Sequence, residues 1–128
     1  MVLHCTMLLK KTQRGIFPII YLIFISFLFF VPGSAFPKSN WLSDIYFDKW
    51  IHIVLFLGLA LLCCWGFAVL KHKHLILLLV LLAVYGLVVE IIQEHIIKNR
   101  SFDLKDWVAD IIGSFLGILG WNLKTKSI

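Results

Sequence analysis

Charged residues are scarce in this sequence: Asp, Glu, Lys and Arg make up 15% of its 128 residues, whereas 61% are hydrophobic. The mean hydropathy is correspondingly high, at +0.96. A soluble domain of this length has too little interior to hide so much apolar surface. The scarcity of charge therefore argues against an ordinary soluble domain and favours a single membrane domain, residues 1–128.

The chain also lacks a basic run and a cysteine pattern. Its formal net charge of +5 is scattered along the sequence. No run of Lys and Arg could follow a phosphate backbone, so we expect membrane lipids and no nucleic acid among its partners. The three cysteines, Cys5, Cys63 and Cys64, have neither zinc-ligand nor disulfide spacing. The sequence predicts no metal centre and no cofactor.

Long apolar stretches are what the sequence does contain. Spanning the hydrocarbon of a membrane takes about 20 residues, with roughly 17 as the minimum. Two stretches exceed this minimum, and two others reach it once flanking residues are counted. They predict an all-α, polytopic membrane protein with four transmembrane helices in an antiparallel bundle. The predicted spans cover residues 16–32, 50–70, 75–95 and 105–123. The "KHKH" segment, residues 71–74, predicts a tight polar turn between the second and third spans.

The first apolar stretch has a second interpretation. Lys10, Lys11 and Arg14 precede it, and "VPGSA" follows it with small residues. This order is also typical of a signal peptide, here with cleavage after Ala35. The sequence leaves open whether the first span is retained or removed.

Lys and Arg predict the orientation of the four spans. Seven of them fall in the N-terminal tail, the "KHKH" turn and the C-terminal tail, against five on the opposite side. Since cytoplasmic loops carry the excess of Lys and Arg, we expect both termini in the cytoplasm. All seven acids then belong to the outer side or to helix ends next to it.

The acids are spaced so that they share helix faces near the outer boundary. Asp48 and His52 are four residues apart, as are Asp106 and Asp110, and Glu90 precedes Gln93 by three. Polar groups at this depth must be paired or face a wet cavity. We therefore predict one ligand-binding cluster, built from residues of three helices: Asp48, Lys49, His52, Glu90, Gln93, Arg100, Asp103, Asp106 and Asp110.

Plainer interpretations of the same residues remain open. Asp48 and Lys49 also fit a solvated helix start, and His52 fits an interhelical hydrogen bond. Asp103 or Ser101 fits the N-cap of the fourth helix. On that helix Gly113 and Gly117, with Gly120 after them, predict close approach of a neighbouring helix.

Three segments together resemble the VanZ-like membrane protein family: "DKWIH" at 48–52, "EIIQ" at 90–93 and "RSFDLKDWVADIIG" at 100–113. The resemblance covers about residues 16–121. It departs at Asp110, where many members carry Asn and a carboxylate adds a charge. The matching residues are Asp48, Lys49, His52, Glu90, Gln93, Arg100, Asp103, Asp106 and Gly113. The resemblance implies a bacterial inner-membrane protein of the type named for teicoplanin resistance, but it supplies no reaction.

Two functions are compatible with these features. The leading hypothesis is a non-enzymatic protein whose cluster binds or shields a lipid-linked or cell-envelope ligand, or a glycopeptide, with Lys49 and Arg100 taking anionic groups. The alternative is an intramembrane enzyme acting on a lipid or isoprenoid headgroup, with Glu90 or His52 as general base. In that alternative, carboxylates of Glu90, Asp103, Asp106 and Asp110 would suit magnesium or calcium. The sequence does not identify the ligand or the oligomeric state.

Overall fold

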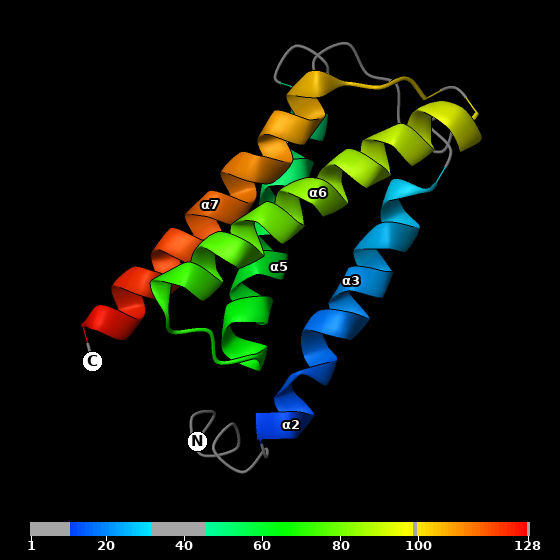
Figure 1. The fold of residues 1–128 in the computed structure, drawn as a ribbon. Helices are drawn as coiled ribbons and strands as arrows, with labels where there is room; N and C mark the ends of the chain where they lie inside the picture. Colours follow the sequence, from blue (N-terminus) through cyan, green and yellow to red (C-terminus); the bar gives the residue numbers. More distant parts are fainter. Residues whose placement is uncertain (1–10, 32–45, 99, 128) are drawn as a thin grey trace.

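The computed structural model describes residues 11–31, 46–98 and 100–127. These residues form one short helix and four longer ones, with no strand among them (Figure 1). The helices are α2 (Lys11–Arg14), α3 (Ile16–Phe29), α5 (Phe47–Gly66), α6 (His72–Ile96) and α7 (Leu104–Lys126). The all-α prediction is confirmed for the described part of the chain.

The four longer helices place the acids at one end of the molecule. α3 and α6 end, and α5 and α7 begin, at the top of Figure 1. The α5–α6 connection, α2 and the end of α7 lie at the other end. Because successive long helices run in opposite directions, the polar positions near residues 48, 90 and 106 return to the same end of the bundle.

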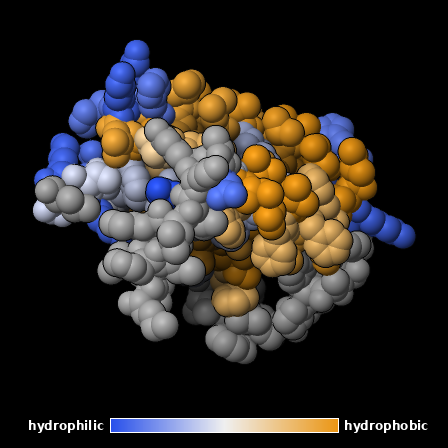
Figure 2. Space-filling view, turned by 90° about the horizontal axis from the view of Figure 1, so that it is seen from below, coloured by the Kyte–Doolittle hydropathy of each residue, from blue (hydrophilic) through white to orange (hydrophobic). Residues whose placement is uncertain are grey.

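Two of the helices, α5 and α6, are long and apolar enough to cross a membrane, judged by length and composition. α3 is also apolar but has 14 residues, and α7 is not among the helices that meet both criteria. Large apolar side chains are exposed on all four helices, for example Ile23, Val54, Val80 and Phe115. Figure 2 shows broad hydrophobic areas, in orange, on the surface of the described residues.

The α5–α6 connection differs from the predicted polar turn. α5 ends at Gly66, and Ala68 has the left-handed backbone angle φ 51°. The backbone N–H of Val69 donates to the Cys64 carbonyl across this break (3.0 Å), a helix stop that usually uses glycine. Lys71 is the N-cap of α6, so His72–His74 form its first turn. The apolar residues after Gly66, which were predicted to be helical, make the connection instead.

Glycines on α7 bring it against α5, in the most extensive helix pair of the bundle. A Cβ on Gly113 would collide with the Ile53 carbonyl oxygen, and a Cβ on Gly117 would lie 2.7 Å from the Leu57 carbonyl oxygen. The prediction that Gly113 and Gly117 face a neighbouring helix is confirmed. Among the described residues, no atom of another helix lies within 4 Å of the Cβ position of Gly120, so that part of the prediction is wrong.

α3 packs against α5 and α6 through polar and apolar contacts. The Tyr21 hydroxyl donates to the Leu55 carbonyl (3.0 Å), and the Ser26 and Tyr85 hydroxyls are 2.7 Å apart. Ile25 and Phe29 are buried in the hydrophobic core. Cleavage after Ala35, which lies outside the described residues, would remove this helix from the bundle.

Candidate functional site

Lys49, near the start of α5, connects the beginnings of two helices. Its ammonium nitrogen Nζ lies 2.7 Å from a carboxylate oxygen of each of Asp48, Asp103 and Asp106. An ammonium group has three N–H donors, so all three can be satisfied by these acids. This geometry therefore does not favour the predicted role of Lys49, which was to bind an external anion. Lys49 instead neutralises and orients acids from α5 and the start of α7.

His52 and Asp110 form the buried part of the site. Nδ1 of His52 lies 2.7 Å from Oδ1 of Asp110, and these residues are 4% and 0% exposed. Nε2 of the same ring lies 3.8 Å from Oδ2 of Asp106. The ring is therefore held between two acids of α7 that are one helical turn apart.

Glu90, on α6, is 0% exposed. Its Oε2 accepts a hydrogen bond from the backbone N–H of Asp103 at 3.2 Å. Its Oε1 has no hydrogen-bond partner among the residues that the structure describes. Oδ2 of Asp110 likewise has no hydrogen-bond partner among the described residues. Buried polar atoms are usually hydrogen-bonded, so these two oxygens are exceptions that both lie in the site.

Asp103 is the N-cap of α7, as the sequence predicted, and its Oδ1 accepts from the Lys105 backbone N–H at 2.9 Å. Partial burial is the largest single influence on the Asp103 pKa and acts to raise it. The hydrogen bond from Lys49, the bond from Lys105 and the Lys49 charge together outweigh it and hold the pKa of Asp103 below its usual range. Asp103 therefore stabilises the fold above its unfolded pKa, and this contribution is lost as the pH falls through the lowered value.

Gln93 and Arg100, also predicted for the site, bind the backbone at the end of α3. Nε2 of Gln93 donates to the Phe29 carbonyl at 2.7 Å, and an Arg100 guanidinium N–H donates to the Val31 carbonyl at 3.3 Å. Gln93 is buried, whereas Arg100 is half-buried. These two residues connect α3 and α6 beside the acids.

We call the remaining seven predicted residues the polar cluster: Asp48, Lys49, His52, Glu90, Asp103, Asp106 and Asp110. It contains five carboxyl groups, one ammonium group and one imidazole. Two subsets place three donor atoms within 4.8 Å of one another, His52 with Glu90 and Asp106, and Asp48 with Asp103 and Asp106. The cluster is therefore built to hold positive charge or hydrogen-bond donors.

Two residues that the sequence did not single out shape the cluster. A Cβ on Gly86 would lie 2.7 Å from Oδ2 of Asp110, so this glycine makes room for the buried acid. The ring of Phe29 packs against the imidazole of His52, with centroids 4.8 Å apart. Gly86 lies one helical turn before Glu90, and this spacing could have indicated that a glycine shares the helix face of the acid. Nothing in the sequence distinguishes Phe29 from the other aromatic residues of α3.

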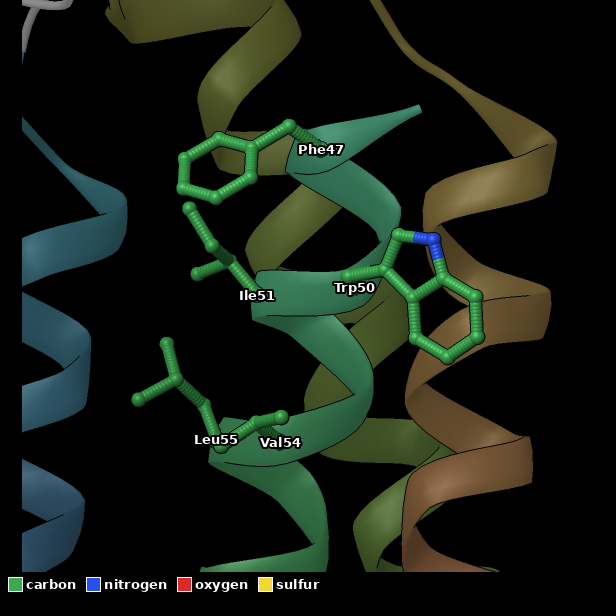
Figure 3. A pocket seen from close by; sticks show the side chains of 5 residues that line it. All are labelled: Phe47, Trp50, Ile51, Val54 and Leu55. Carbon is green, nitrogen blue, oxygen red and sulfur yellow. The ribbon is translucent and has the colours of Figure 1, made fainter. Parts of the chain in front are cut away.

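An apolar groove lies on the first turns of α5. It has a volume of about 320 Å³ and is lined by Phe47, Trp50, Ile51, Val54 and Leu55. Figure 3 shows Phe47, Ile51 and Leu55 on the side of α5 nearest α3, with Trp50 on the side of α7. Lys49 and His52 come from the same turns of α5, but at 3.6 residues per turn they fall on the side of the helix away from the groove residues.

Comparison of the chain with protein-family models, with curated proteins and with solved structures finds no match. The resemblance to the VanZ-like family accordingly stays a prediction that depends on the three segments quoted above.

Proposed function

We propose that this chain is a VanZ-like protein of the bacterial inner membrane that binds a lipid-linked or cell-envelope ligand at its outer boundary. In this proposal α3, α5, α6 and α7 are the four spans, and both termini are cytoplasmic. The polar cluster then lies at the outer end of the bundle. The ligand classes are a lipid-linked cell-wall precursor or a glycopeptide of the teicoplanin type.

The packing of α3 and α7 supports four spans. α7 has 23 residues, about 35 Å at 1.5 Å per residue, which exceeds a hydrocarbon thickness of about 30 Å. It contacts α5 along Gly113 and Gly117, and its other face exposes Ile112, Phe115 and Leu119. α3 is shorter but exposes Ile20, Ile23 and Phe27. These apolar faces suit lipid contact better than water.

The distribution of charge supports the proposed orientation. Arg14, Lys71, Lys73, Lys124 and Lys126 belong to the end of the bundle opposite the polar cluster. An excess of Lys and Arg is characteristic of the cytoplasmic side. The acids of the polar cluster then face the cell envelope.

The observation that carries the ligand proposal is the convergence of five acids from three helices at one end of the bundle. Asp48 and Asp103 keep 60% and 38% of their side chains exposed, while Glu90 and Asp110 are fully buried. A solvated helix rim does not require buried acids, because their desolvation is costly. A lipidic ligand would place its polar headgroup at these acids.

One contact favours a second function, an intramembrane enzyme that acts on a lipid or isoprenoid headgroup. Asp110 holds His52 through Nδ1, which is how an acid orients an imidazole general base. The nearby Ser114 hydroxyl is buried and donates to the Asp110 carbonyl. Since that hydroxyl is engaged in its own helix, any reaction here would use water or a ligand hydroxyl rather than Ser114 as nucleophile.

The test is recovery of the ligand with the purified protein. Wild type, Glu90→Gln and Glu94→Gln are extracted from bacterial membranes in polymer-bounded nanodiscs, and bound lipids are quantified by mass spectrometry. We expect a lipid-linked envelope species enriched with wild type and Glu94→Gln and reduced about tenfold with Glu90→Gln, a change of about 1.4 kcal/mol. Teicoplanin susceptibility of the expressing cells should follow the same order.

Glu94 is the matched control because it lies one turn further along α6 and is exposed. Equal recovery from all three proteins, or no enriched species in any of them, would contradict the proposal.

A further inference from the structure

A second cation site is visible within the polar cluster once Lys49 is accounted for. Of the two groups whose donor atoms lie within 4.8 Å, Asp48, Asp103 and Asp106 all contact the Lys49 ammonium at 2.7 Å. That group already surrounds a cation. His52, Glu90 and Asp106 form the other group, and no Lys or Arg contact to His52 or Glu90 is found among the described residues.

An independent observation marks the second group as a ligand site. Glu90 is 0% exposed, and its Oε1 has no hydrogen-bond partner among the residues that the structure describes. An uncompensated carboxylate oxygen in a buried position is costly, and it calls for a cation or a donor. One donor atom of Glu90 lies within 4.8 Å of donor atoms of both His52 and Asp106.

The surrounding contacts leave one potential donor atom on each of the other two residues. Nδ1 of His52 is engaged by Asp110 at 2.7 Å, which leaves Nε2 on the side of Asp106. A carboxylate behind an imidazole is the usual outer-shell arrangement of a metal-binding histidine. Oδ1 of Asp106 is held by Lys49 at 2.7 Å, and its Oδ2 is the oxygen nearest the imidazole. Asp110 therefore positions His52 without occupying Nε2, and Lys49 positions Asp106 without occupying Oδ2.

We propose that His52, Glu90 and Asp106 bind one divalent transition-metal ion, Mn²⁺ or Zn²⁺. A neutral imidazole and two carboxylates match the charge of such an ion and combine the nitrogen and oxygen donors that these metals accept. Three protein ligands leave coordination positions for an oxygen of a bound headgroup. This inference goes beyond the proposed function, which requires no metal, and it replaces the prediction that the chain has no metal site.

The test uses Mn²⁺ as the probe and electron paramagnetic resonance as the measurement. Wild-type protein in nanodiscs is treated with a chelator, washed and titrated with Mn²⁺. We expect one equivalent to bind, with a coupling to one ¹⁴N nucleus from His52 and displacement by Zn²⁺. Because this coupling is measured on the wild-type chain, the test does not depend on whether a variant folds.

Variants then assign the ligands. Glu90→Gln and Asp106→Asn should each weaken Mn²⁺ binding by more than about 100-fold, beyond the range caused by outer-shell changes, and Asp110→Asn by about 10- to 100-fold. Glu94→Gln should bind as wild type does. Absence of stoichiometric binding, absence of nitrogen coupling, or equal binding by Glu90→Gln and Glu94→Gln would overturn the proposal.

Recovery of the envelope lipid from chelator-treated protein is measured in parallel. If Mn²⁺ does not bind but the lipid is still recovered, the metal site is overturned and the proposed function stands. If Mn²⁺ binds but no lipid is recovered, the proposed function is overturned and the metal site stands.

Discussion

Replacement of Gly113 with leucine is expected to abolish the stable fold. A Cβ at this position would collide with the backbone carbonyl oxygen of Ile53, and backbone atoms cannot move aside as a flexible side chain can. Overpacking of this kind costs about 1–3 kcal/mol where neighbours can relax, and more where they cannot. We expect a loss of more than about 3 kcal/mol, measured as failure to recover monodisperse protein or a collapse of the melting temperature in detergent.

Gly120→Leu is the matched control for this variant. It makes the same change on the same helix, at a position with no heavy atom within 4 Å of its Cβ site. Its melting temperature should stay close to that of wild type. Equal behaviour of the two variants would show that α5 and α7 do not meet as described.

Replacement of Lys49 with methionine is expected to cause the second-largest loss of stability. Methionine keeps most of the apolar volume but leaves Asp48, Asp103 and Asp106 without their shared cation. Removal of one partner from a buried ion pair costs about 3–5 kcal/mol. The exposure of Asp48 and Asp103 reduces this, so we expect about 2–3 kcal/mol, measured by denaturation in detergent.

The double variant Lys49→Met/Asp106→Asn should recover part of the loss, because it removes the most buried of the unpaired charges. Lys124→Met, at an exposed position of α7, is the control for loss of a positive charge and should change little. A Lys49→Met protein as stable as Lys124→Met would mean that the acids are held by other interactions.

The positions of the polar cluster could be predicted from the sequence because lipid makes polar groups costly. Antiparallel helices bring residues near 48, 90 and 106 to one end of the bundle, and acids placed close together there must share partners. The spacing of Gly113 and Gly117 likewise predicted the α5–α7 contact. Both predictions follow from helical periodicity and chain direction alone.

The pairing within the cluster could not be predicted, because it depends on how the helices cross. The sequence offered Lys49, His52 and Arg100 to five acids without a rule for assigning them. In the structure Lys49 contacts three acids, and His52 lies between two acids of α7. An Arg100 guanidinium N–H donates to the Val31 carbonyl. The room for Asp110 beside Gly86 is likewise a property of the α6–α7 packing.

The end of α5 was predicted wrongly for a related reason. Hydropathy placed the break at the polar residues 71–74, whereas α5 ends at Gly66 and Ala68, two residues later, has a positive φ. Alanine rarely adopts this conformation, so no local signal marked it. A helix end that depends on tertiary packing cannot be predicted from hydropathy.

Labelling of single cysteines in intact cells tests the placement of the polar cluster most directly. In a chain in which Cys5 is replaced by alanine, Ser101→Cys lies in the exposed α6–α7 connection, and Ser127→Cys lies just beyond the last residue of α7. The native Cys63 and Cys64 are buried. Ser39→Cys offers a second outer position, although residue 39 lies outside the described part of the chain.

A membrane-impermeant maleimide should modify Ser101→Cys and Ser39→Cys in intact cells and Ser127→Cys only after permeabilisation. Modification of Ser127→Cys in intact cells, or protection of Ser101→Cys until permeabilisation, would contradict an outward-facing cluster in a four-span protein.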